Sequence, residues 1–154
     1  RAVQRYGADR QRLHCIGESL GADGAWHLAA LKPNHFAAVG GSCGSVEPYD
    51  WENWRWGSEP EAYRRLASGI GQRTALWFCH GGKDDFVPVE QSRRFLEALQ
   101  ESRAPSALGA LLGSRADGAE VVYKEYEDLD HHVWDKAYWD DGMIQWLVSQ
   151  RMSS

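Results

Sequence analysis

A serine flanked by glycines stands between an apolar run and a helical pattern near the start of the chain. The apolar run covers residues 13–16, and a helical pattern covers residues 20–32; between them lies Gly17-Glu18-Ser19-Leu20-Gly21. A strand that turns sharply into a helix at a serine strains the serine backbone, and bulky flanking side chains would collide there. The hydroxyl is then held above the sheet, where the helix N-terminus and the Leu20 amide face a developing negative charge. The motif predicts that Ser19 is a nucleophile.

The G-x-S-x-G pattern is a weak signal when taken alone. Glycine and serine are common, so the pattern arises by composition in roughly one chain in ten of this length. A serine hydroxyl also needs a base to remove its proton and an acid to orient that base. The hypothesis therefore requires an aspartate and a histidine in the order Ser, Asp, His, each placed after a strand.

Length and composition are those of one ordinary globular domain. The chain has 154 residues, with 43% hydrophobic and 25% charged residues, so residues 1–154 are expected to form a single domain. The net charge is −5 and no basic run occurs, so nucleic acid is not an expected partner. No apolar run approaches the length of a membrane-spanning helix, so no membrane span is expected.

Three cysteines, Cys15, Cys43 and Cys79, are spread along the chain. An odd number without close spacing argues against a disulfide framework and against a zinc site. We expect free thiols in the core, which favours a reducing, cytoplasmic compartment. The serine chemistry suggested above requires no metal and no organic cofactor.

Apolar runs alternate with helical patterns from one end of the chain to the other. The expected strands are residues 12–16, 36–40, 74–79 and 120–126, and the expected later helices are residues 20–32, 59–68, 88–100 and 138–150. This alternation is typical of right-handed βαβ units and a parallel sheet, in which ligands bind beyond the carboxyl ends of the strands. Ser19 and the loops at 80–88 and 128–134 all follow strands, so they are expected at the same edge. Residues 45–58 are expected to be a loop, and residues 102–118 a surface excursion.

Two neighbouring aspartates and two neighbouring histidines are the candidates for the acid and the base. Asp84 and Asp85 follow the third expected strand, and His131 and His132 follow the fourth. Histidine suits the base because its pKa lies near working pH. The alternatives are a solvated acidic turn, a surface histidine pair, or a metal site at Asp130-His131-His132 with nearby Asp128 and Asp135.

Several sequence motifs, taken together, resemble the C-terminal part of an α/β-hydrolase. The resemblance is to the esterase and predicted-peptidase branch related to carboxylesterases, dienelactone hydrolases and polyhydroxybutyrate depolymerases. It covers about residues 6–150 and rests on the serine motif, Ala25-Trp26, Pro33-x-x-Phe36-Ala37-Ala38, the H-G-x-x-D-x-x-V-P phrase at 80–88, and His131 with Trp134, Ala137 and Tyr138. The chain departs from the pattern at Leu20-Gly21-Ala22, where the branch often has Met-Gly-Gly, and at Asp130, where a glycine usually precedes the histidine.

The resemblance selects among the candidates and implies an activity. It makes Asp84 the acid and His131 the base of a Ser-His-Asp triad, with the Leu20 amide as half of an oxyanion hole. It implies a serine hydrolase that cleaves a carboxylic ester through an acyl-enzyme, with a peptide bond as the second candidate substrate. It also implies further strands before residue 12, including a loop with the second oxyanion donor. The chain is therefore expected to be a partial α/β-hydrolase fold whose partner is the missing N-terminal half.

Trp51, Trp54 and Trp56 crowd into one short segment. They are candidate substrate-binding residues, because an aromatic wall suits an acyl or sugar group; the alternative is a lid packed on the core. A second hypothesis for the whole chain is a non-catalytic binding or scaffold module that keeps the fold and has lost the activity.

Overall fold

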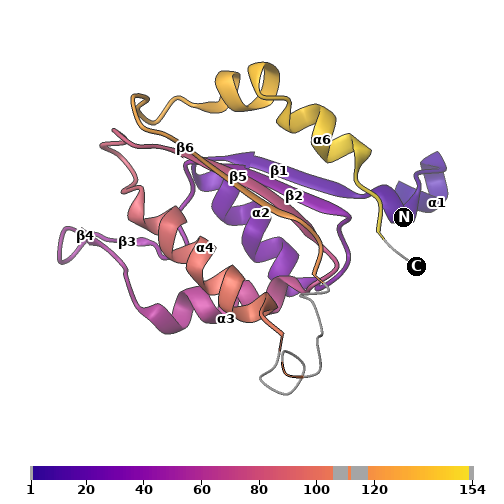
Figure 1. The fold of residues 1–154 in the computed structure, drawn as a ribbon, viewed down its shortest axis with the longest axis horizontal. Coiled ribbons are helices and arrows are strands. Elements are labelled where there is room, and N and C mark those ends of the chain that lie inside the picture. Colours follow the sequence, from indigo (N-terminus) through magenta and orange to yellow (C-terminus); the bar gives the residue numbers. More distant parts are fainter. Residues whose placement is uncertain (1, 106–110, 112–117, 153–154) are drawn as a thin grey trace.

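The computed structural model describes residues 2–105, 111 and 118–152 (Figure 1). The N-terminal part holds α1 (Ala2–Tyr6), a 3-10 turn η1 (Arg10–Arg12), β1 (His14–Glu18), α2 (Leu20–Leu31) and β2 (Ala38–Ser42). The middle holds β3 (Tyr49–Asp50), β4 (Arg55–Trp56), α3 (Pro60–Ile70) and β5 (Ala75–Gly81). The C-terminal part holds α4 (Glu90–Arg103), β6 (Val121–Tyr126), a π-helix η2 (Lys136–Asp140) and α6 (Met143–Ser149).

A four-stranded parallel sheet forms the centre of the molecule. The strand order is β1-β2-β5-β6, and each neighbouring pair is parallel. Glu18 lies opposite Ser42, Ser42 lies opposite Cys79, and Gly81 lies opposite Tyr126, so all four carboxyl ends meet at one edge. The parallel sheet predicted from the alternating pattern is confirmed.

Helices cover both faces of the sheet, as Figure 1 shows with α6 on one side and α2, α3 and α4 on the other. Side chains alternate between the faces along each strand. On β5, Leu76 and Phe78 pack into the core with α2, α3 and α4, whereas Trp77 and Cys79 pack with η2 and α6. Because both faces are covered, every residue of β2 and of β5 is buried, which explains why these two strands are apolar except near their carboxyl ends, where Ser42 and His80 lie.

The helix that follows Ser19 buries small residues and one tryptophan. Its buried residues are Ala22, Ala25, Trp26 and Ala29, while Leu20 and Leu31 at either end are largely exposed. Trp26 lies so close to β2 that a side chain on Gly41 would come within 2.8 Å of its ring. The helix therefore packs close to the sheet through alanines and Trp26, and not through the leucines at its ends.

Two segments differ from the sequence-based expectation. The tryptophan segment, expected to be a loop, contains a short antiparallel pair in which Tyr49 lies opposite Trp56 and Asp50 lies opposite Arg55. The last helix, expected to be continuous over residues 138–150, is divided into η2 and α6. Gly142 separates them with a φ of 79°, a left-handed conformation that glycine adopts without steric cost.

Most of the expected surface excursion at residues 102–118 lies outside the described residues. Within the described part of the chain, no helix combines the length and the apolar character needed to cross a membrane.

Candidate active site

Ser19 occupies a strained turn between β1 and α2. Its φ is 52° and its ψ is −122°, a combination that non-glycine residues rarely adopt. The Ser19 amide donates a hydrogen bond of 2.7 Å to the Ser42 carbonyl at the end of β2, which fixes the turn to the sheet. Leu20 begins α2, so its amide is among the N–H groups that a helix leaves without an intrahelical acceptor.

The two glycines of the motif have different roles. A side chain on Gly17 would overlap the carbonyl of Gly21, so the close passage of the strand and the first helical turn requires glycine there. A side chain on Gly21 would meet no atom of the described residues within 4 Å. The expectation that both flanking glycines are required sterically is therefore wrong for Gly21.

His131 lies between Ser19 and Asp84. Its Nε2 is 2.9 Å from Ser19 Oγ, and its Nδ1 is 2.7 Å from Asp84 Oδ2. An ionised carboxylate can only accept, so the proton of the neutral imidazole is on Nδ1. Nε2 is then left as an acceptor for the Ser19 hydroxyl. The arrangement gives an unbroken hydrogen-bonded path from the hydroxyl to the carboxylate.

The Asp84 side chain is fully buried among N–H groups. Its Oδ1 accepts from the amides of Phe86 and Val87, each at 2.9 Å, and its Oδ2 faces both His131 and, at 3.1 Å, His80 Nε2. Burial by itself favours the neutral acid, yet the surrounding hydrogen bonds outweigh it and hold the pKa of Asp84 well below its usual range. Asp84 is therefore a carboxylate at neutral pH.

Backbone contacts join the loop after β5 to the loop after β6. The Gly82 amide donates to the Tyr126 carbonyl at 2.8 Å, and the Lys83 amide donates to the Leu129 carbonyl at 2.9 Å. A side chain on Gly81 would overlap the carbonyl of Asp130. These contacts fix the backbone that carries Asp84 against the backbone that carries His131.

The alternative acid and base lie away from this path. Asp85 is exposed. His132 is also exposed, and its Nδ1 is 3.6 Å from Asp130 Oδ1. Both ring nitrogens of His131 face Ser19 and Asp84, and so they do not face a metal position beside Asp130.

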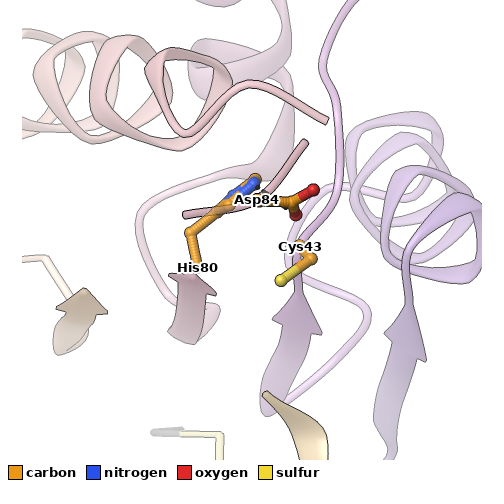
Figure 2. Close-up of side chains that lie close together, drawn as sticks. All are labelled: Cys43, His80 and Asp84. Carbon is orange, nitrogen blue, oxygen red and sulfur yellow. Dashed lines mark ion pairs between the residues drawn. The ribbon is translucent and has the colours of Figure 1, made fainter. Parts of the chain in front are cut away.

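One cluster in the described residues has the donor types of a metal site: Cys43, His80 and Asp84 (Figure 2). The donor chemistry fits a metal poorly. Burial raises the pKa of the Cys43 thiol to about 12, with the Asp84 carboxylate adding to the effect, and metals bind the thiolate. His80 already bonds Ser92 Oγ through Nδ1 and the Val87 carbonyl through Nε2.

The tryptophan segment approaches the site through Phe86. The Trp56 indole N–H donates to the Phe86 carbonyl at 3.1 Å, and the Phe86 ring lies 5.4 Å from the His131 ring between centroids. Trp51 and Trp54 are 74% and 75% exposed, with Trp51 packed edge-on against Tyr49. They are thus not a lid packed on the core, which was the alternative reading of these two residues.

Sequence reasoning missed the contacts of His80 and Phe86 at the site. Both lie inside the H-G-x-x-D-x-x-V-P phrase, where His80 is a fixed position and Phe86 a variable one. The fixed histidine was the available signal, because a histidine at the end of a buried strand needs polar partners.

Comparison with known proteins identifies the fold. No family model matches the chain, and no curated protein matches it. Among solved structures, a thermostable esterase is 24% identical with a TM-score of 0.58 over 97% of this chain and 34% of its own length. A putative dienelactone hydrolase from Klebsiella pneumoniae is 19% identical with a TM-score of 0.61 over 94% of this chain and 53% of its own. Dipeptidyl peptidase 4 of Porphyromonas gingivalis is 17% identical with a TM-score of 0.68 over 93% of this chain and 20% of its own.

These structures share the architecture and are longer than this chain. The chain spans 34%, 53% and 20% of their respective lengths, and it aligns over nearly all of its own. The structural superpositions establish the fold, whereas activity follows from the residues at the site. The chain therefore has a partial α/β-hydrolase fold, similar to that of esterases and dienelactone hydrolases.

Proposed function

We propose that this chain is part of a serine hydrolase that cleaves carboxylic esters, with Ser19 as nucleophile, His131 as base and Asp84 as the acid that orients it. The observation that carries the proposal is the hydrogen-bonded path from Ser19 Oγ to His131 Nε2 (2.9 Å) and from His131 Nδ1 to Asp84 Oδ2 (2.7 Å). The three side chains come from three separate loops at the carboxyl edge of the sheet. Their spacing and tautomer meet the geometric requirements for activating a serine.

The reaction follows from the position of each proton. His131 Nε2 accepts the hydroxyl proton as Ser19 Oγ bonds to the ester carbonyl carbon, and a tetrahedral oxyanion forms. The same proton then passes to the leaving alcohol oxygen as the carbon–oxygen bond breaks, which leaves an acyl-Ser19. Water attacks the acyl carbon as His131 takes one of its protons. The carbon–Oγ bond then breaks, the carboxylic acid leaves, and His131 returns the proton to Ser19 Oγ. Asp84 stays ionised throughout and stabilises the imidazolium of each step.

The oxyanion is proposed to bind the Leu20 amide at the start of α2. The helix dipole favours a negative charge at this point. A second donor is proposed to come from an N-terminal half of the same fold, whose strands would pair with β1, the outer strand of the sheet in the described residues. On this proposal residues 1–154 are one piece of a single hydrolase domain.

An aromatic surface beside the triad is the proposed substrate wall. It consists of Phe86 and the tryptophans Trp51, Trp54 and Trp56. Exposed aromatic faces bind apolar acyl groups and the apolar faces of sugars. Peptide-bond cleavage is the second candidate activity, because dipeptidyl peptidase 4 is among the proteins with this architecture.

Hydrolysis of p-nitrophenyl esters by the full-length protein tests the proposal, with Ser19→Ala as the paired control. We expect ester hydrolysis that Ser19→Ala abolishes, and covalent labelling of Ser19 by a fluorophosphonate probe. A folded protein that neither labels at Ser19 nor hydrolyses any of a panel of short, long and aromatic esters and peptides would contradict it. The non-catalytic binding module would then be the better account. Activity that survives chelators in the wild type removes a metal-dependent reaction.

A further inference from the structure

A second histidine approaches the proposed catalytic acid. Figure 2 shows His80 at the end of β5 with its ring beside the Asp84 carboxylate. His80 Nε2 lies 3.1 Å from Asp84 Oδ2, the same oxygen that accepts from His131. The side chains of His80 and Asp84 are both fully buried, so this contact is shielded from bulk solvent.

The hydrogen-bond partners of His80 fix its proton on Nε2. That nitrogen lies 2.9 Å from the Val87 carbonyl oxygen as well as 3.1 Å from the Asp84 carboxylate, and both of these oxygens can only accept. Nδ1 lies 2.8 Å from Ser92 Oγ, whose hydroxyl can donate to it. The buried imidazole therefore donates its N–H to the Val87 carbonyl, and the same Nε2 lies 3.1 Å from the acid with its proton attached.

His80 also acts on Asp84 through the backbone. Val87, whose carbonyl His80 holds, donates its own amide to Asp84 Oδ1 at 2.9 Å. The carboxylate is thus held on one oxygen by the turn that His80 anchors and approached on the other oxygen by His80 itself. Cys43, on another side of Asp84, supplies only a neutral thiol, because burial raises its pKa to about 12.

We propose that His80 is a positioning residue for Asp84: its Nε2–H and its hold on Val87 keep the carboxylate ionised and turned so that Oδ2 faces His131. The inference rests on the proposed function, since it assigns His80 a role in the reaction only if Asp84 is the acid. His80 does not touch the substrate, so its removal is expected to change kcat and leave KM unchanged.

His80→Met and His80→Gln in the full-length protein form a matched pair. The two side chains have similar length, but only glutamine places an N–H donor as many bonds from the backbone as His80 Nε2. His80→Met removes both the donor that holds the Val87 carbonyl and the N–H beside Asp84 Oδ2, so it is expected to lower kcat on the order of tenfold or more. His80→Gln is expected to restore most of it. KM should be the same in both.

The pKa of Asp84, followed by carbon-13 NMR of labelled aspartate, gives a readout that general destabilisation would not move. Asp84 should titrate at higher pH in His80→Met than in the wild type, and His80→Gln should bring it back. Tyr63→Phe is the control for lost stability, because it removes a buried hydrogen bond of 2.7 Å to Gln91 without touching Asp84. It should lower the midpoint of thermal unfolding and leave kcat and the pKa of Asp84 unchanged.

Two further variants separate failure of this inference from failure of the proposed function. If Ser19→Ala and Asp84→Asn keep full activity, the proposed function is wrong. If both are inactive while His80→Met keeps the wild-type kcat and the wild-type pKa of Asp84, only the role of His80 is wrong. Should His80→Met not fold, Ser92→Ala replaces it, because it removes the hydroxyl that holds Nδ1. An unchanged kcat and Asp84 pKa in that variant would equally overturn the inference.

Discussion

Trp56 and Phe86 are joined by a hydrogen bond of 3.1 Å from an indole N–H to a backbone carbonyl. Phe86 in turn donates its own amide to Asp84 Oδ1 at 2.9 Å. The tryptophan segment is therefore connected to the proposed acid through a single residue. The tryptophan segment can thus affect activity in two separable ways. It positions Phe86, and its exposed tryptophan rings offer a surface to the substrate.

Two tryptophan variants separate these contributions. Trp56→Phe keeps an aromatic ring and removes the N–H, so we expect a loss of about 1 kcal/mol in the free energy of unfolding and a lower kcat. Trp54→Ala removes an exposed ring, so stability should change by less than about 0.5 kcal/mol while KM for bulky acyl esters rises. Chemical denaturation and a panel of p-nitrophenyl esters measure both. If Trp54→Ala lowers stability and leaves the substrate preference unchanged, the substrate-wall proposal fails.

The two glycines of the serine motif should respond differently to alanine. Gly17→Ala places a methyl group on the Gly21 carbonyl, which is main chain and cannot move away alone, so we expect a loss of several kcal/mol. Gly21→Ala enters open space in the first turn of α2 and should be neutral or stabilising by up to about 1 kcal/mol. Urea denaturation of both variants makes the comparison. Equal losses in the two variants would show that the turn is not packed as described.

Asp84 should contribute to stability above acidic pH. Its pKa in the folded protein lies below the ordinary value of 3.8, so folding favours the ionised form of the Asp84 side chain. This stabilisation is fully present above about pH 4 and is lost as the pH falls through the folded pKa. The Asp84→Asn variant should therefore show a weaker fall in the free energy of unfolding below pH 4. Denaturant titrations from neutral pH down to about pH 2 test this; identical pH slopes in both proteins would contradict it.

Cys43 should resist alkylation in the folded protein. Burial raises the pKa of its thiol to about 12, so at neutral pH almost no thiolate is present, and its side chain is fully buried. Cys15 is only partly buried and should react first, although burial raises its pKa as well. Peptide mass mapping after brief iodoacetamide treatment, with and without denaturant, gives the rates. Modification of Cys43 at the same rate in the folded and unfolded protein would refute the expectation.

The sequence predicts the sheet well because its two central strands are buried on both faces. Residues such as Val39 and Phe78 must be apolar whichever way they point, so they give continuous apolar runs. The face of α2 is harder to predict, since close packing on the sheet selects alanines and Trp26 over the larger leucines. The β3 and β4 strands have two residues each, which is too few to show an alternating pattern of apolar and polar residues.

The candidate site also has one part that the sequence predicts and one part that it does not. Ser19, Asp84 and His131 follow three parallel strands, so topology alone brings them to one edge, and their catalytic roles remain predictions. The contacts of His80 depend on Val87 and Ser92, which lie 7 and 12 residues further along the chain. No local pattern indicates such contacts, because they form only when the loop after β5 folds back on the start of α4.

The loops that carry Asp84 and His131 are tied by the Gly82 and Lys83 amides, which bond to the carbonyls of Tyr126 and Leu129. The Lys83 bond is made by main-chain atoms alone, so it does not depend on which side chain stands at that position. Positions such as Lys83, whose side chain pairs with Asp128 at the surface, are thus free to vary without displacing acid from base. Substitutions at such surface positions can therefore change the charge around the site without changing the relative position of the two loops.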